Sequence, residues 1–182
     1  DLLGPVAAGD RVAAAELLAE GVLLGSYRFD VFKDAPEGTS LATVSVVAKG
    51  GARVAAAVDK GVAVGTAVCF ARDLVNTPGG DLTPKEFAKR ATVRGEAAGL
   101  EVEVWEKAAI KKAKFGGLLG VNRGSEEDPR FVIMRYRPEG TAKRKIAFVG
   151  KGLTFDAGGL SLKTATGMET MKNDMGGGAA VV

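Results

Sequence analysis

Two lysines and two aspartates near the end of the chain have the types and spacing to form one chemical site. They are Lys151, Asp156, Lys163 and Asp174. Carboxylates bind divalent cations, a neutral lysine amine can join them, and a lysine cation can stabilise an oxyanion. Keeping a lysine neutral at pH 7 costs roughly 4 to 5 kcal/mol, whereas a tight metal site supplies about 10 kcal/mol. Single surface lysines and aspartates are usually only solvated, so the hypothesis rests on the four together.

The 182-residue chain contains no histidine and a single cysteine, Cys69. For the residues present, this excludes Ser-His-Asp and Cys-His nucleophiles, H-E-x-x-H zinc sites and histidine general bases. It also excludes an internal disulfide and a paired-cysteine metal site, and we expect Cys69 to pack as a small apolar residue. A metal site here must therefore use carboxylates, backbone carbonyls, water or a lysine amine.

The four residues must be positioned by the elements around them. Residues 146–150 (IAFVG) predict a short strand that runs into Lys151, and functional groups gather at the carboxyl ends of strands in α/β sheets. Residues 130–137 predict another strand. Only residues 138–145 lie between the two, too few for a crossover helix, so the strands should be antiparallel neighbours if they pair. Glycines 158 and 159 permit unusual backbone angles between the aspartate and the second lysine.

Helices and strands alternate along the rest of the chain, which favours an α/β fold. Thr83 begins one helix as its cap, followed by proline and then by a glutamate that completes a capping box. Glycines 116 and 117 are expected to end another helix. The expected helices are 10–24, 52–75, 84–98 and 107–115, and the further expected strands are 39–48 and 101–105. No unbroken apolar run approaches the roughly 20 residues that span a bilayer, so no membrane segment is expected.

Four separated motifs resemble the leucyl aminopeptidase family of dinuclear metallopeptidases, in that family's order. They are YRFD (27–30), ARDLVNTP with LTP (71–84), GGLLGVNRGSEE (116–127), and VGKGLTFDAGGLSLK followed by MKNDMGG (149–177). The similarity runs from about residue 21 to residue 182. It implies the end of a smaller N-terminal α/β domain (1–50), then a linker helix (about 52–75) and the first part of a mixed-sheet α/β metallopeptidase domain (within 51–182).

The resemblance also implies a role for individual residues. Lys151 matches the lysine that ligates one metal through its amine, and Asp156 matches the aspartate that bridges both metals. Asp174 matches a further aspartate ligand. Lys163 matches the catalytic lysine that polarises the scissile carbonyl, and Met171 matches a methionine that lines the pocket for the first side chain of the substrate. Spacing alone does not decide which lysine has which role.

The activity that the resemblance implies is hydrolysis of a peptide at its free N-terminus, releasing leucine or a similar residue. Two divalent ions, zinc or manganese, would bind and acidify the attacking water. The resemblance further implies a cytoplasmic homo-oligomer, generally a hexamer. Three matched ligands are too few for two ions, and the family's NTDAEGR-type motif, which supplies the others, does not occur before Val182. We therefore expect a chain truncated before that motif, inactive by itself and weak in metal binding.

Other functions remain open at this stage. One is a non-catalytic oligomerisation or regulatory fragment of the same family, and another is an accessory DNA-binding role. A net charge of +3 spread along the chain, with 6% aromatic residues, argues against nucleic-acid binding. An unrelated nucleotide-binding α/β protein would need a phosphate loop, which this sequence lacks.

Overall fold

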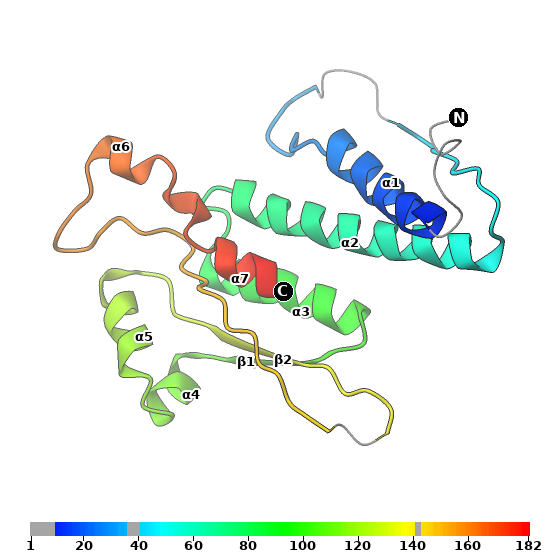
Figure 1. Cartoon of the computed structure of the whole chain (residues 1–182). Helices are drawn as coiled ribbons and strands as arrows, with labels where there is room; N and C mark the ends of the chain where they lie inside the picture. The colour runs from blue at the N-terminus through cyan, green and yellow to red at the C-terminus, as the bar shows by residue number, and fades with distance from the viewer. Residues whose placement is uncertain (1–9, 36–40, 141–142) are drawn as a thin grey trace. The chain divides into compact units, whose positions relative to one another are not determined.

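The computed structural model describes residues 10–35, 41–140 and 143–182 and divides the chain into two compact units (Figure 1). The first unit ends at Asp73, and the second extends from Leu74 to Val182. Helices combine with a small antiparallel sheet, so the predicted α/β class is confirmed. The expected domain boundary at residue 50 and the role of the long helix as a linker stay predictions.

The first unit contains helix α1 (Asp10–Ser26) and most of helix α2 (Ala52–Asn76), close to the predicted 10–24 and 52–75. The two helices approach closely where α2 carries glycine. A Cβ atom on Gly61 would lie 3.1 Å from the Cβ atom of Ala19, and one on Gly65 would lie 3.0 Å from the Cβ atom of Leu23. Glycine at these two positions lets the helix backbones pack against each other without voids.

Residues from the first two motifs meet at the end of α1. The Tyr27 hydroxyl donates to Asp73 Oδ1 at 2.8 Å, and Arg72 Nη1 donates to the Leu24 carbonyl at 3.2 Å. The Arg72 guanidinium also lies 5.4 Å from the centre of the Tyr27 ring, a cation–π distance. A carbonyl near the C-terminus of α1 thus receives a cation from α2, and two motifs that are far apart in sequence meet there.

Helix α2 meets the length and hydropathy of a membrane span, with a mean hydropathy of 1.6 in its most apolar window. Asp59, Lys60 and Arg72 interrupt the apolar residues of α2, so the helix contains no unbroken apolar run of about 20 residues. The expectation of no membrane segment stays a prediction. A long alanine- and valine-rich core helix passes the same test, so the composition is weak support for a membrane role.

The predicted strand at 39–48 is wrong for the residues described. Residues 41–48 are extended but form no ladder within the described part of the chain, and residues 39 and 40 lie outside it. Val47 is 89% exposed. A β-branched sequence forms a strand only with a partner to receive its backbone hydrogen bonds, so propensity alone was insufficient.

The second unit is built on helix α3 (Pro84–Ala97) and a sheet of strands β1 (Glu101–Trp105) and β2 (Phe131–Arg135). Thr83 caps α3 as predicted, and its Oγ1 accepts from the Glu86 amide at 3.2 Å. The strands pair antiparallel, with Glu101 opposite Arg135 and Trp105 opposite Phe131. Helix α3 packs on this sheet, and its apolar face contains the buried residues Phe87, Ala88, Ala91 and Gly95.

Two predictions in this unit are wrong. Residues 146–150 form no strand, and β2 pairs with β1 rather than with them. Ile146, Phe148 and Val149 are 78%, 78% and 92% exposed, because no described strand lies beside them. The glycines at 116–117 do not end a helix. Helix α4 (Lys107–Lys112) ends before them, Lys114 follows it with a φ of +60°, and helix α5 (Gly116–Val121) begins at these glycines.

The end of the chain consists of short turns of helix. They are helix α6 (Ala165–Met168), the 3₁₀ turn η2 (Met171–Asn173) and helix α7 (Gly176–Val181). Another 3₁₀ turn, η1 (Asn122–Gly124), directly follows α5. Leu74, Leu82, Ile110 and Met175 are fully buried and form the centre of this unit. Met175 lies directly between η2 and α7, so the segment that carries Asp174 is anchored in the core.

Candidate functional site

The structure brings the four predicted site residues together as two lysine–aspartate pairs. Lys151 Nζ lies 2.7 Å from Asp174 Oδ1, and Lys163 Nζ lies 2.9 Å from Asp156 Oδ2. The residues that pair are 23 and 7 positions apart in the sequence. Each proposed ligand aspartate is therefore within hydrogen-bonding distance of one of the two lysines.

A tight loop fixes the second pair. The Gly158 amide donates to Asp156 Oδ1 at 2.8 Å, and the Lys163 amide donates to the Ala157 carbonyl at 2.9 Å. Gly158 has a φ of +91°, which favours glycine, and a Cβ atom there would lie 2.9 Å from the Lys163 nitrogen. The Lys163 ammonium, followed by the Gly158 amide, lowers the pKa of Asp156 below its ordinary value. Asp156 is thus held as a carboxylate, the form that binds a cation.

The first pair is positioned by backbone contact between its two segments. The Gly178 amide donates to the Lys151 carbonyl at 2.6 Å, which joins the start of α7 to the backbone of the first lysine itself. Gly150 lies so close to α7 that a Cβ atom would come within 2.7 Å of the Gly177 carbonyl carbon. Two glycine backbones are in direct contact here, and that contact carries Asp174 to Lys151.

Asp174 has a free acceptor. Its side chain is 18% exposed, and its Oδ2 atom is buried with no hydrogen-bond partner among the described residues. A buried carboxylate oxygen without a partner loses solvation free energy, so such an atom calls for a cation or a donor. Together with the adjacent amine of Lys151, it offers the nitrogen and oxygen donors that zinc or manganese accepts.

The donor set fits a metal ion only in part. The described residues contain no group of three or more His, Cys, Asp or Glu side chains gathered to hold a metal. Lys151, Asp156 and Asp174 could contribute an amine and two carboxylates. An ion would have to displace the two lysine–aspartate contacts, since each carboxylate now accepts from an ammonium group. Lys151 would have to lose a proton in the exchange.

Met171, the proposed substrate-binding residue, lies in η2 three positions before Asp174 and is half-buried. The Met171 side chain would move together with Asp174, the proposed metal ligand, because the two residues lie in and directly after one short turn. Its role in contacting a substrate stays a prediction.

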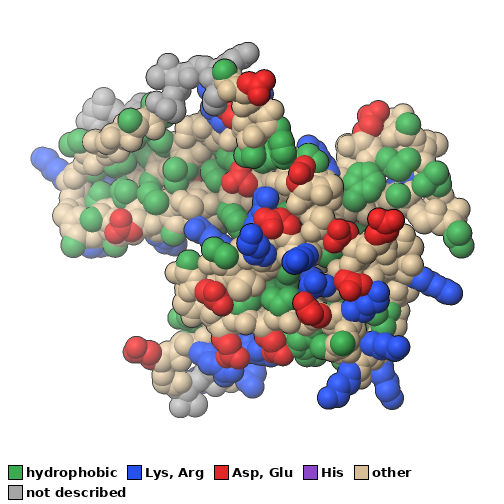
Figure 2. Space-filling view, turned by 180° about the vertical axis from the view of Figure 1, so that it is seen from behind, with side chains coloured by type: hydrophobic (Ala, Val, Ile, Leu, Met, Phe, Trp, Pro, Cys, Tyr) green, Lys and Arg blue, Asp and Glu red, His purple; other side chains and the backbone are tan. Residues whose placement is uncertain are grey.

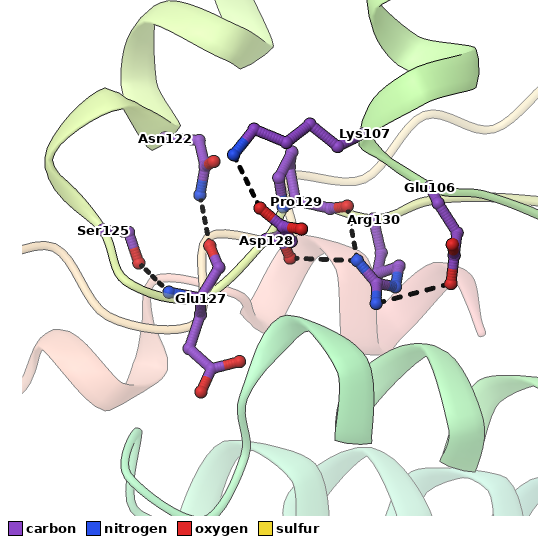
Figure 3. A network of polar contacts seen from close by, with 8 residues as sticks. All are labelled: Glu106, Lys107, Asn122, Ser125, Glu127, Asp128, Pro129 and Arg130. Atoms are coloured by element: carbon purple, nitrogen blue, oxygen red, sulfur yellow. Dashed lines mark hydrogen bonds and ion pairs between the residues drawn. The ribbon is translucent and has the colours of Figure 1, made fainter.

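The GGLLGVNRGSEE motif, by contrast, makes no hydrogen bond or ion pair with the four site residues within the described part of the chain. It leads into a loop that polar contacts hold in place (Figure 3). Asn122 Nδ2 donates to the Glu127 carbonyl at 2.7 Å, and Lys107 Nζ lies 2.7 Å from Asp128 Oδ1. Arg130 donates to two carbonyls of the same loop. These contacts tie the loop to α4, so a structural role accounts for them.

Two residues that the sequence did not single out connect the site to the end of α2 and the loop after it. Gly79 lies against the segment before Asp156, where a Cβ atom would be 2.9 Å from the Cβ atom of Phe155. Lys172 reaches the Asn76 carbonyl from η2. The glycine pair at 79–80 is the sequence signal for the close approach of Gly79.

Gly79→Ala should lower the free energy of unfolding by about 1 to 3 kcal/mol, because the new methyl group meets Phe155 at its rigid Cβ atom. Urea denaturation followed by circular dichroism measures the change. Gly80→Ala is the matched control, because nothing lies within 4 Å of its Cβ position. Equal losses in the two variants would show that the contact with Phe155 is not responsible.

Comparison with known proteins identifies the family. Residues 69–182 match the cytosol aminopeptidase family, catalytic domain. A protein of Mycobacterium marinum named probable cytosol aminopeptidase is 49% identical over 96% of this chain. Two solved structures also align with 92% of the chain. The bottromycin maturation enzyme BotP in complex with Mn has a TM-score of 0.79 and 41% identity, and a leucine aminopeptidase of Caenorhabditis elegans has 0.77 and 28%.

The chain belongs to the cytosol aminopeptidase family, which confirms the resemblance drawn from the four motifs. It spans about a third of the length of these relatives, covering 34% of the mycobacterial protein, of BotP and of the nematode enzyme.

Proposed function

We propose that this chain contributes one side of the active site of a metal-dependent aminopeptidase, which releases leucine and similar residues from the N-terminus of peptides. The observation that carries the proposal is the pairing of Lys151 with Asp174, whose second oxygen is buried and unpartnered among the described residues. Family membership supports the same activity.

Lys151, Asp156 and Asp174 would hold two divalent ions, which when bound supply Lewis-acid polarisation and acidify a water molecule. Asp156 is suited to lie between them, since its carboxylate is kept ionised by its neighbours. Asp174 would present its unpartnered oxygen to one ion. Lys151 would act as a neutral amine, so its bond to Asp174 would be replaced on metal binding.

Lys163 has the opposite task, because it must stay cationic to stabilise the oxyanion formed as the peptide carbonyl is attacked. Its side chain is 29% exposed, and its Nζ atom lies 2.9 Å from a carboxylate oxygen of Asp156. Met171 would contact the first side chain of the substrate. The free α-amine of the peptide would fix the cleavage point one residue from the N-terminus.

Manganese is the first ion to test, because a related structure contains Mn, while zinc suits the same donors. The relatives named cytosol aminopeptidases support a cytoplasmic location for the whole protein. A homo-oligomer, and specifically a hexamer, is part of the proposal by family resemblance only.

Metal titration of the protein expressed from its complete gene tests the proposed site. We expect Lys151→Ala and Asp156→Asn to weaken Mn²⁺ binding at least tenfold, as losses of ligands or of groups that orient them do. Hydrolysis of a leucyl p-nitroanilide should fall in parallel. Lys112→Ala is the control, since Lys112 is exposed at the end of α4. Unchanged Mn²⁺ affinity in both site variants would rule out the proposed ligands.

The two alternative functions gain no support from the structure. On the face drawn in Figure 2, acidic and basic side chains are interspersed over the described residues, which is not the basic stripe that nucleic acids select. Salt-dependent retention of the protein on DNA would be needed to revive that alternative.

A further inference from the structure

Lys172 makes a long-range contact that the proposed chemistry does not use. It lies in η2, directly after Met171 and two residues before Asp174. Its Nζ atom donates to the backbone carbonyl of Asn76 at 3.2 Å, across 96 positions of sequence, and the bond is partly buried. A flexible lysine held in this way contributes to the geometry of the turn that carries it.

The acceptor is the C-terminus of a long helix. Asn76 is the last residue of α2, and the last turn of this helix, which is fully described, contains no basic side chain. The final carbonyls of a helix lack partners within the helix and carry partial negative charge. Lys172 therefore supplies the cation that α2 lacks, and the attraction acts on η2 as much as on the helix.

The region around Asn76 is a firm anchor. Leu74 and Leu82 are fully buried, and Thr77 is 3% exposed. The Thr77 hydroxyl accepts from Arg90 Nη1 at 3.3 Å, and Arg90 is itself paired with Glu86 at 2.8 Å. A donor bonded to this region is therefore fixed relative to the core of the second unit.

The same region also contacts the other half of the site. Gly79, three residues after Asn76, packs against Thr154 and Phe155, which immediately precede Asp156. The segment 76–79 thus touches the chain beside Asp156 through Gly79 and the chain beside Asp174 through Lys172. The segment 76–79 therefore helps to position both aspartates, which are 18 positions apart in the sequence.

We propose that Lys172 is a positioning residue of the site: its bond to the end of α2 holds η2 so that Asp174, which follows this turn, keeps its place beside Lys151. The assignment rests on the proposed function, because it gives Asp174 the role of a metal ligand. Lys172 is bonded to a backbone carbonyl and is not one of the proposed ligands, so it would act through the turn.

The test compares three variants in the protein expressed from its complete gene. Lys172→Met removes the ammonium and keeps the length of the side chain, Lys172→Arg restores a cationic donor, and Lys112→Met removes an exposed lysine. Should Lys172→Met not fold, Lys172→Gln, which retains an uncharged donor, replaces it. Two readouts are needed, namely amide hydrogen exchange of residues 173–178 and the dissociation constant for Mn²⁺.

We expect Lys172→Met to accelerate exchange at the Gly178 amide, which donates to Lys151, by about tenfold or more, and to weaken Mn²⁺ binding by about tenfold. Lys172→Arg should remain within about twofold of the natural protein in both readouts. Folded Lys172→Met with natural exchange and natural Mn²⁺ affinity would overturn the proposal. Faster exchange with unchanged affinity would also overturn it, since the turn would then be tethered without effect on the site.

Failure of the proposed function gives a different result. A natural protein that binds no Mn²⁺ would refute the metal site, and hydrogen exchange alone would then decide whether Lys172 holds η2. Binding of Mn²⁺ by the natural protein, with both readouts unchanged in Lys172→Met, would leave the metal site intact and refute only the positioning role.

Discussion

Lys163→Met is expected to lower kcat for a leucyl substrate by about 10² to 10³-fold, the loss typical of removing one stabilising donor from an oxyanion. The Michaelis constant should change little, because the ammonium acts on charge that develops only in the transition state. Steady-state hydrolysis by the protein expressed from its complete gene measures the two constants separately.

The metal affinity of the same variant separates catalysis from site assembly. Lys163 is the largest cause of the lowered pKa of Asp156, so its removal lets that pKa rise toward the ordinary range, where the carboxylate is still ionised at pH 7. Mn²⁺ should therefore bind at least as tightly, since the competing ammonium is gone. A matching loss of Mn²⁺ affinity would show that Lys163 assembles the site instead of assisting the reaction.

Gly150→Ala should have the largest effect on stability, with an expected loss of at least ~2 kcal/mol in the free energy of unfolding. The new Cβ atom would overlap the Gly177 carbonyl and lie 2.8 Å from the Cα atom of Gly178. Both are backbone atoms of α7, so no side-chain rotation can relieve the overlap. The contact that brings Asp174 to Lys151 would open, and Mn²⁺ affinity would fall with it.

Gly152→Ala provides the matched control two residues further along the same segment. Its Cβ atom would lie 3.5 Å from Phe87 Cε1, an ordinary contact, so its effect on stability should stay within about 0.5 kcal/mol. Urea denaturation of the two variants, with Mn²⁺ titration of each, gives the comparison. If Gly150→Ala and Gly152→Ala are equally stable, α7 can move away from residue 150 at little cost, and the prediction is wrong.

Local sequence signals predicted the helices better than the strands. Thr83, Pro84 and Glu86 specify the start of α3 within a few residues, and the structure places the cap as expected. The strand at 146–150 had the right composition but no partner among the described residues. Strand pairing depends on segments distant in sequence, and β2 pairs with β1 instead, with partner residues 26 positions apart at one end of the ladder and 34 at the other.

The site could be predicted as a set of residues but not as an arrangement. The motifs named Lys151, Asp156, Lys163 and Asp174, yet the spacing left open which lysine would meet which aspartate. Lys151 meets the distant Asp174 because the Gly178 amide bonds to the Lys151 carbonyl. That contact depends on the close approach of two backbone segments. The only sign of it in the sequence is that both segments are rich in glycine.

The exposed apolar segment at 146–149 has a consequence for the solubility of the protein. An extended apolar stretch with unpaired backbone groups is a template for strand addition between molecules. Lys143, Arg144 and Lys145 directly precede it, and like charges flanking such a stretch oppose self-association. Salt screens that repulsion, with a Debye length of about 10 Å at 0.1 M and 3 Å at 1 M. The polypeptide should therefore be most soluble in dilute buffer and aggregate as salt is added, the reverse of a protein that assembles through opposite charges.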